Sequence, residues 1–316
     1  MIFPFFLLAD MLMLMAWIIV KWSRSWIPLT AMVLSFPAIR IYLPLNFSSD
    51  PPSGSIKIVS YNVACYTMDK NCSSPKNAIY DYLRQQDADI VCLQEDVVPT
   101  SDTVFSYSSL YPYNDTVHIN LPTTVTINAV GIHSRYPIVK KERIWYHSVA
   151  NGSVAFYVKI GRDTVLIVNN HLESTHLSTS DRQRYNDIIN GGMDSDDAKL
   201  ETRKLLGKLS QAMVRRARQA ETVHRYIQRH RRYPVIVCGD FNDTPISYAR
   251  RTVADGLTDC YVSSGNGFGI SFNQRGFYFR IDHIMCSDHF EPYKCHIDKT
   301  IKASDHYPVI CWLKRK

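Results

Sequence analysis

The sequence predicts a mixed α/β domain preceded by a segment that belongs to a membrane. Short apolar runs that end in polar residues alternate with helical stretches, and the first 45 of the 316 residues are almost entirely apolar. With 46% hydrophobic residues, the chain can bury a sizeable core. The net charge of +7 favours an anionic partner such as a phosphate ester, nucleic acid or lipid head group, although many proteins of this size carry as much charge without one.

The N-terminal apolar region falls into two stretches. Residues 1–20 contain one charge, Asp10, and are about long enough to cross a hydrocarbon core as a helix. The second stretch, Ile27 to Leu45, follows a short segment in which Lys21 and Arg24 are flanked by tryptophans, as is typical of a loop at a membrane interface. We therefore expect residues 1–45 to form a transmembrane helical hairpin.

A cleaved secretory signal is the alternative to a hairpin, but no charged leader precedes the apolar run and no small-residue cleavage site follows it. If Lys21 and Arg24 mark the cytoplasmic side, the rest of the chain is extracytoplasmic, although Arg40 weakens that assignment. Residues 46–55, NFSSDPPSGS, have the composition of a linker, which places the start of the main domain at residue 56.

The domain at residues 56–316 contains five apolar runs typical of strands buried on both faces. Helical stretches at Pro75 to Gln86 and at about Leu200 to His230 lie between them. Each run ends in, or carries, a polar side chain: IKIVSYN at Asn62, ADIVCLQE at Glu95, VLIVNNH at His171, PVIVCGDFN at Asp240 and Asn242, and RIDHIMCS around Asp282.

Polar ends gathered at one edge of the sheets would form a crevice, the usual place for a ligand. One such carboxylate is usually a helix cap or a turn former. Five strand ends, together with SDHYP at residues 304–308, are harder to explain in that way. Their Asn, Asp, Glu and His side chains suit Mg²⁺ or Mn²⁺, and too few Cys or His residues cluster for zinc.

These motifs resemble the endonuclease/exonuclease/phosphatase superfamily, also called the DNase I-like fold. The resemblance covers about residues 56–316 and rests on SYN, DIVCLQE, GIHSRYPI, NNHLES, CGDFNDTP, RIDHIM and SDHYPV, all in the family's order. The hydrophobic N-terminus is similar to that of a membrane-tethered bacterial subgroup, in which fuller copies carry one more helix upstream.

The resemblance implies a four-layer α/β/β/α sandwich of two mixed sheets with the active site at one edge. It also implies a metal-dependent hydrolase of phosphate esters, a phosphodiesterase or phosphomonoesterase, in which water attacks phosphorus in line with the leaving oxygen. Glu95 matches the principal ligand of the Mg²⁺ or Mn²⁺ ion, with Asn62 beside it and Asp305 on the far side.

The same resemblance assigns the remaining roles. Asp240 matches the carboxylate that orients or deprotonates the attacking water, and Asn242 matches the residue that positions the phosphate. His306 matches the histidine that donates to the phosphate or protonates the leaving group, and Asp282 would fix its tautomer and keep it charged. His171 matches a second histidine in contact with the phosphate.

Two further residues have less specific matches. Arg135 matches a position near the phosphate-binding edge, but an arginine before Tyr-Pro equally braces a turn. Ser271 is expected to be structural. DNA-cleaving relatives often carry a basic residue within two places after the metal-binding glutamate, whereas Asp96 and Val97 follow Glu95 here, which weakens the nuclease interpretation.

The substrate therefore stays open among nucleic acid, phospholipid head groups and small phosphoesters, and no feature indicates a protein partner. A catalytically idle, membrane-bound binding module is the alternative from another class, and it predicts the loss of an essential ligand. Serine hydrolase, zinc protease and nucleotide-binding motifs are absent from the sequence.

A basic helix and two cysteines leave further alternatives open. The region from Arg203 to Arg232 holds ten Lys or Arg residues and one acid, so it is either a helix on the sheet with a solvated basic face or a surface for anionic lipid or nucleic acid. Cys65 and Cys72 could close a small disulfide in an oxidising compartment. The cysteines within apolar runs are interpreted as buried thiols.

Overall fold

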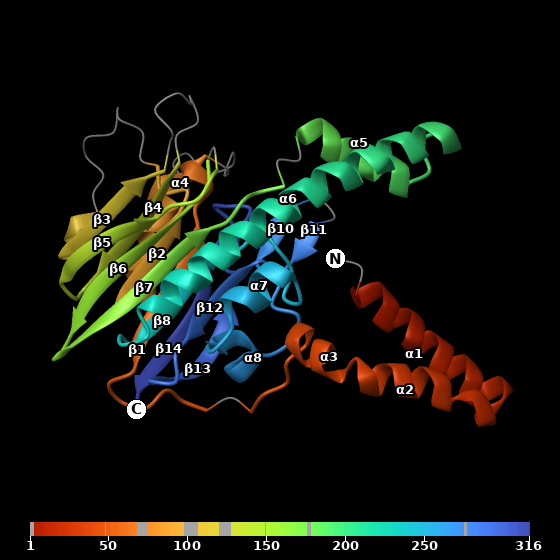
Figure 1. Ribbon diagram of the computed structural model, residues 1–316, viewed down its shortest axis with the longest axis horizontal. Helices are drawn as coiled ribbons and strands as arrows, with labels where there is room; N and C mark the ends of the chain where they lie inside the picture. The colour runs from red at the N-terminus through yellow and green to blue at the C-terminus, as the bar shows by residue number, and fades with distance from the viewer. Residues whose placement is uncertain are drawn as a thin grey trace.

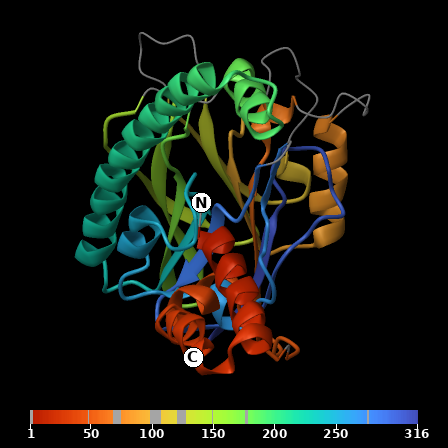
Figure 2. The ribbon, with the colours of Figure 1, turned by 90° about the vertical axis from the view of Figure 1, so that its right-hand side faces the viewer.

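The computed structural model describes residues 3–47, 49–67, 75–97, 107–119, 128–148, 150–175, 178–274 and 277–316. Two six-stranded β-sheets pack face to face, and helices cover both outer faces (Figures 1 and 2). This arrangement confirms the predicted fold of two mixed sheets in an α/β/β/α sandwich. Cys72, and with it the pairing to Cys65, lies outside the described residues.

The first sheet has the strand order β13-β14-β1-β2-β4-β3. β1 and β2 are parallel, so both end at the same edge, while β14 is antiparallel to β1 and the chain enters it from that edge. The strands are β1 (Ile56–Asn62), β2 (Ile90–Gln94), β3 (Tyr113–His118), β4 (Ala129–Ser134), β13 (Phe290–Ile297) and β14 (Val309–Arg315).

The second sheet has the order β5-β6-β7-β8-β12-β9. β7 and β8 are parallel with His171 opposite Asp240, and β12 is antiparallel to β8 with Asp282 opposite Asp240. This register places three polar side chains side by side at one edge. The strands are β5 (Ile138–Ile144), β6 (Gly152–Ile160), β7 (Asp163–His171), β8 (Val235–Asp240), β9 (Thr258–Asp259) and β12 (Asp282–Cys286).

The helices cover the two outer faces unequally. α4 (Pro75–Gln86) packs on the first sheet, while α6 (Ser195–Arg229) and α7 (Tyr248–Val253) pack on the second. The first half of α6 extends beyond the sandwich, on the same side as the N-terminal helices (Figure 1). The shorter elements are α5 (Thr179–Ile189), α8 (Cys260–Ser264), β10 (Phe272–Gln274), β11 (Phe277–Phe279), η1 (Trp22–Arg24), η2 (Ala64–Tyr66) and η3 (Tyr107–Ser109).

β8 shows why the central strands are apolar at nearly every position. Ile236 and Cys238 face the other sheet, whereas Val235 and Val237 face α6. Side chains alternate between the two faces of a strand, and in this sandwich both faces are buried. Each fully buried aliphatic side chain contributes about 1.5–3 kcal/mol through the hydrophobic effect. Cys238 is a free, buried thiol, in agreement with its predicted role as a small hydrophobe.

The N-terminal region differs from a pair of spanning helices. α1 (Phe3–Val20) is a continuous apolar helix with no buried residue, and by length and composition it is the one candidate span among the described residues. The second apolar stretch is divided into α2 (Trp26–Leu34) and α3 (Phe36–Tyr42), which are separated at Ser35. Because about 20 apolar residues are needed to cross a bilayer, neither short helix spans one alone, and the predicted hairpin is not shown.

Candidate active site

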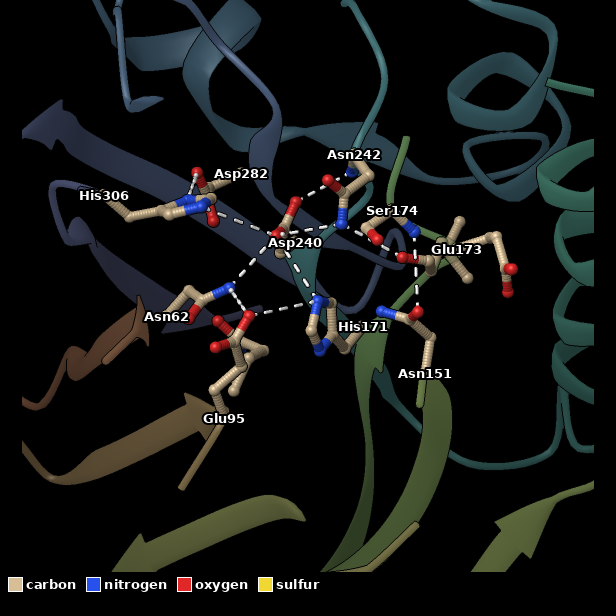
Figure 3. Close-up of polar contacts among 12 residues, drawn as sticks. Asn62, Glu95, Asn151, His171, Glu173, Ser174, Asp240, Asn242, Asp282 and His306 are labelled. Atoms are coloured by element: carbon tan, nitrogen blue, oxygen red, sulfur yellow. Dashed lines mark hydrogen bonds and ion pairs between the residues drawn. The ribbon is translucent and has the colours of Figure 1, made fainter. Parts of the chain in front are cut away.

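Polar side chains from both sheets converge at the edge where β1, β2, β7 and β8 end (Figure 3). The topology explains the convergence, because each pair of parallel strands ends at this edge and the antiparallel β12 and β14 begin there. The residues brought together are Asn62, Glu95, His171, Asp240, Asn242, Asp282 and His306.

Asp240 lies at the centre of this group and is 1% exposed. Its Oδ1 accepts a hydrogen bond from the backbone N–H of Asn242 at 2.7 Å, and its Oδ2 accepts bonds from the side-chain amides of Asn242 and Asn62, both at 3.1 Å. The Nε2 atoms of His171 and His306 each lie 3.7 Å from the same Oδ2. Burial raises the pKa of Asp240, and the charge of His306 opposes that effect.

His306 and Asp282 form a buried pair next to Asp240. The Nδ1 of His306 is 2.9 Å from Oδ2 of Asp282, which leaves Nε2 directed toward Asp240. Burial by itself would lower the pKa of His306, but the carboxylates of Asp282 and Asp240 outweigh it and hold the pKa well above its usual value. The arrangement keeps a protonated imidazole at the edge of the sheet.

Glu95 directly follows β2 and turns out of the strand with a φ of 55°. Its side chain is 29% exposed, in contrast to the buried Asp240 and Asp282. Oε1 accepts a hydrogen bond from the Asn62 amide at 3.2 Å, and Oε2 lies 3.6 Å from the Sγ of Cys65. Glu95 is therefore the most accessible of these carboxylates.

The donor set fits a divalent metal ion. In the described part of the chain, no lysine or arginine pairs with Glu95, Asp240 or Asp282, and the only cationic groups within 4 Å are His171 and His306. The positive charge of His306 offsets only part of the negative charge of these carboxylates, and buried charge that stays unbalanced is costly unless another cation is present. Oxygen ligands of this kind suit Mg²⁺ or Mn²⁺.

Ligand atoms of Asp240, Asp282 and His306 also lie within 4.8 Å of one another, so these three residues have the spacing of a metal site. However, all three are buried, and Asp282 already holds Nδ1 of His306. A ligand position next to Glu95 is more accessible to an ion and to a phosphate, and we favour it on that ground.

The remaining predicted residues lie in different places. The carboxylate of Asp305 accepts a hydrogen bond from Gln274 at 2.9 Å and lines the same cavity as Glu95. Ser271 accepts hydrogen bonds from the backbone N–H groups of Ile281 and Asp282, which fixes the start of β12.

Arg135 is not brought to this edge. It follows β4 at the opposite end of the first sheet, where its guanidinium pairs with Asp87 and with Asp89. The two acidic partners explain this position, and of the two alternatives for Arg135 the structure agrees with a bracing role away from the phosphate-binding edge.

Asp96 explains the absence of a basic residue after Glu95. Its carboxylate is 3% exposed and accepts hydrogen bonds from Tyr66 at 2.5 Å and from Thr116 at 2.9 Å. Its Oδ2 lies 3.4 Å from Nε2 of His133, and a Cβ at Gly131 would come within 2.1 Å of the same oxygen. Burial would raise the pKa of Asp96, but the bonds from His133 and its other partners lower it. Asp96 therefore anchors the turn that carries Glu95.

A buried arginine beside the site was not identified from the sequence. Arg216 on α6 is fully buried, donates from Nε to Asp243 at 3.1 Å and donates from Nη1 to the carbonyl of Glu173 at 3.0 Å. It thus joins the segments that follow His171 and Asp240. Asp243 and Glu173 belong to the motifs CGDFNDTP and NNHLES, which is a signal for their position, but nothing distinguishes Arg216 among the basic residues of α6.

The polar edge opens into a cavity of about 1470 Å³. Glu95, His171, Asp240 and His306 line one end of this cavity. Such a concave site with a few convergent polar groups is the usual form of a ligand site.

The chain combines two packed mixed sheets with an edge rich in acidic residues and histidines, and a comparison with protein families agrees with this combination. The chain belongs to the Endonuclease/Exonuclease/phosphatase family, whose model matches residues 59–306. A comparison with curated proteins gives no match.

Solved structures share the fold. The human Nocturnin catalytic domain with bound sulfate anion has a TM-score of 0.59 at 15% identity, over 85% of this chain and 97% of that one. Truncated TDP2 from Caenorhabditis elegans has a TM-score of 0.58 at 17% identity, over 84% and 99% of the two chains. TDP2 from D. rerio complexed with single strand DNA product has a TM-score of 0.57 at 14% identity, over 83% of this chain and 100% of that one.

Proposed function

We propose that the domain at residues 56–316 is a divalent-metal-dependent phosphoesterase that hydrolyses a phosphate ester by in-line attack of water. The observation that carries this proposal is the position of Asp240, which lies between two histidines and two asparagine amides and beside the accessible carboxylate of Glu95. The family name covers endonucleases, exonucleases and phosphatases, which all act on phosphoesters. The Nocturnin domain binds a sulfate anion, which supports the proposal that a domain of this fold binds a tetrahedral anion such as phosphate.

In the proposed reaction, each residue of the site has a separate role. Asp240 accepts a proton from the attacking water and orients it, while the amides of Asn62 and Asn242 hold the carboxylate in place. His306 donates a proton to the leaving oxygen, because Asp282 keeps its imidazole charged. His171 contacts a phosphoryl oxygen from the other side of Asp240.

Glu95 and Asn62 would hold the ion, which we propose to be Mg²⁺ or Mn²⁺, with Asp305, which lines the same cavity, as a further contributor. A divalent ion at this place supplies charge neutralisation for the phosphoryl oxygens and for the leaving alkoxide.

The test is hydrolysis of bis(p-nitrophenyl) phosphate and p-nitrophenyl phosphate by the full chain, with Mg²⁺, Mn²⁺ or EDTA. Loss of a positioned acid or base costs about 10²–10⁴-fold in rate, so we expect such losses for Asp240→Asn and His306→Ala. Asp288→Asn and His289→Ala are matched controls, since these residues follow the other end of β12, where Asp288 is exposed and His289 is partly exposed. Activity that survives EDTA and both site substitutions would contradict the proposal, and no activity at all would favour the binding module.

We also propose that α1 crosses a membrane, that α2 and α3 together return the chain across it, and that the domain is therefore extracytoplasmic, with Lys21 and Arg24 on the cytoplasmic side. The support is an 18-residue helix with a mean hydropathy of 2.2 and no buried residue, followed by the basic residues Lys21 and Arg24. Labelling of a single introduced cysteine in the domain by a membrane-impermeant maleimide on intact cells tests the orientation. Labelling only after cell lysis would contradict it.

A further inference from the structure

The cavity next to the proposed catalytic edge is larger than a phosphate group requires, and its far part is apolar. Beyond the polar end, its lining includes Leu205, Leu209, Met213, Phe268, Phe272 and Tyr278. A site for a small polar phosphoester would need only the polar end. The apolar part therefore indicates what the remainder of the substrate is made of.

α6 forms one wall of the apolar part. Leu205, Leu209, Met213 and Ala217 line the cavity at intervals of four residues, which is one face of a helix. The second half of α6 buries Ala220 and Ile227 against the sheet, whereas Met213 is 53% exposed and Leu206 is 58% exposed. Leu205 is buried, whereas Met213 and the neighbouring Leu206 present exposed apolar surface to the cavity, and exposed apolar surface of this kind marks a binding site.

The segment around β10 and β11 forms the second wall. Phe272 packs edge-on against the ring of His306, with centroids 5.0 Å apart, so the apolar wall begins at the proposed catalytic histidine. Tyr278 and Phe268, farther along this wall, are both about half exposed.

The N-terminal region closes the third side. Pro4 and Phe5, at the start of α1, line the cavity together with Tyr42 of α3. α1 is the helix long and apolar enough to cross a membrane, and it projects from the same side of the molecule as the first half of α6 (Figures 1 and 2). An apolar chain from a bilayer would reach the cavity along this helix.

The charges in the lining argue against a nucleic acid. Among the described lining residues, the cationic side chains other than histidine are Arg216 and Arg280, and both are buried and bound to protein groups. A channel for a nucleic acid strand needs accessible basic groups along its length. This lining offers apolar side chains instead.

We propose that the substrate is a membrane phospholipid, whose phosphate lies at Glu95, Asp240 and His306 and whose acyl chain lies against α6 and β10–β11. This inference rests on the proposed function. In the reaction, the oxygen of water forms a bond to phosphorus and one P–O ester bond breaks. The proton of water goes to Asp240, and the leaving alkoxide takes a proton from His306 and departs as an alcohol.

The experiment measures kcat/KM for methyl, butyl and hexyl p-nitrophenyl phosphate with the full chain held in amphipol. The reacting group is the same in all three diesters, so only the chain length changes. One buried methylene contributes about 0.8 kcal/mol, or up to about fourfold in affinity, so incomplete burial of five methylenes predicts a rise of about 30-fold from methyl to hexyl.

Met213→Ser and Leu206→Ser should each reduce that rise, because both side chains line the cavity. Leu200→Ser is the matched control, since Leu200 is 51% exposed on the same helix and is outside the lining. All three side chains are exposed, so the variants should fold. If Leu200→Ser reduced the chain-length dependence of kcat/KM equally, the assignment of α6 as a wall of the substrate site would be wrong.

The outcomes separate this inference from the proposed function. Metal-dependent cleavage with the same kcat/KM for all three diesters would overturn the lipid inference and leave the function standing. A clear preference for the p-nitrophenyl ester of thymidine 5′-phosphate over the hexyl ester would also overturn it and favour a nucleic acid. No cleavage of any ester would overturn the proposed function itself. Release of a water-soluble product from phosphatidylglycerol vesicles, abolished in Asp240→Asn, would support both.

Discussion

Two regions of this molecule hold buried carboxylates with different partners, one with an arginine and one without. At the cleft edge, Asp240 and Asp282 are joined by histidines and amides, and the described residues provide no lysine or arginine partner. Near α7 and β12, Asp259 is also buried, but Arg250 donates to its Oδ2 from Nε at 3.2 Å and also from Nη2.

The pKa values follow this difference. Burial raises the pKa of Asp240, whereas at Asp259 burial is outweighed by the charge of Arg250 together with its hydrogen bond and the charges of His283 and Arg280, which hold the pKa at about 2. The Asp259 region has a full set of protein partners and serves stability. At the cleft edge the described residues include no lysine or arginine partner, and the one charged histidine, His306, offsets only part of the negative charge, so the remaining charge is available to a metal ion and a substrate.

The largest expected effect on stability comes from the Asp259 region, which we call the compensated region because an arginine offsets the charge of its buried carboxylate. Arg250→Met should lower the free energy of unfolding by about 3–5 kcal/mol, because it leaves Asp259 buried without its main partner. Urea unfolding followed by circular dichroism measures this. Asp240→Asn in the cleft is the comparison, and it should leave the free energy of unfolding unchanged or raise it, since it removes a buried charge.

Equal destabilisation by Arg250→Met and Asp240→Asn would show that the two regions do not differ in the way we describe. The activity of the folded fraction separates them further, because Arg250→Met should retain kcat/KM while Asp240→Asn loses it.

The sequence predicted the cleft better than the compensated region. Strand ends can be read from apolar runs, and residues such as Asn62 and Asp240 follow those runs directly, so their meeting at one edge follows from parallel pairing. Arg250 and Asp259 lie in short elements without a periodic pattern. Their contact depends on how α7 packs against β9, which no local spacing indicates.

Two positions show the limit of local patterns in more detail. Arg216 has the sequence context of a solvated helix residue, but it is fully buried because Asp243 and the carbonyl of Glu173 lie where α6 passes the strand ends. Arg135 has the context of a phosphate-binding motif, but it lies at the far end of the sheet beside Asp87 and Asp89. In both cases the position of the arginine is determined by where its acidic partners lie in space, and the local sequence does not contain that information.

A metal ion should stabilise the cleft edge and leave the Asp259 region unaffected. A ligand that binds only the folded state at 100 times its Kd contributes about 2.7 kcal/mol, so saturating Mg²⁺ or Mn²⁺ should raise the Tm of the full chain. Glu95→Gln should abolish this increase. Arg250→Met, with its lower starting Tm, should keep it. An increase of the same size in Glu95→Gln would place the ion elsewhere.

The compensated region should also give a pH dependence of stability. His283 is fully buried with its Nδ1 3.7 Å from Oδ2 of Asp259, and burial lowers its pKa to about 3, against about 6.5 in an unfolded chain. Between these values the unfolded state binds a proton that the folded state does not, so stability falls as the pH falls from 6.5 toward 3. The loss from pH 7 to pH 5 should be about 2 kcal/mol.

The difference in unfolding free energy between the wild-type chain and His283→Gln, measured at each pH, isolates this contribution from that of the cleft. The advantage of the wild-type side chain should shrink as the pH decreases. A difference that does not change with pH would mean that His283 is protonated, or stays neutral, in both states.

The smallest expected effect is at Arg135, which tests whether an ion pair outside both regions matters. Its guanidinium is 40% exposed, and its partner Asp87 is 76% exposed. Exposed pairs of this kind contribute about 0–1 kcal/mol, because water screens the charges and ordering two long side chains costs entropy. Arg135→Gln should therefore change the free energy of unfolding by less than about 1 kcal/mol and leave kcat/KM unchanged. A loss of activity comparable to that of His306→Ala would bring Arg135 back to the phosphate and contradict the placement at the opposite end of the sheet.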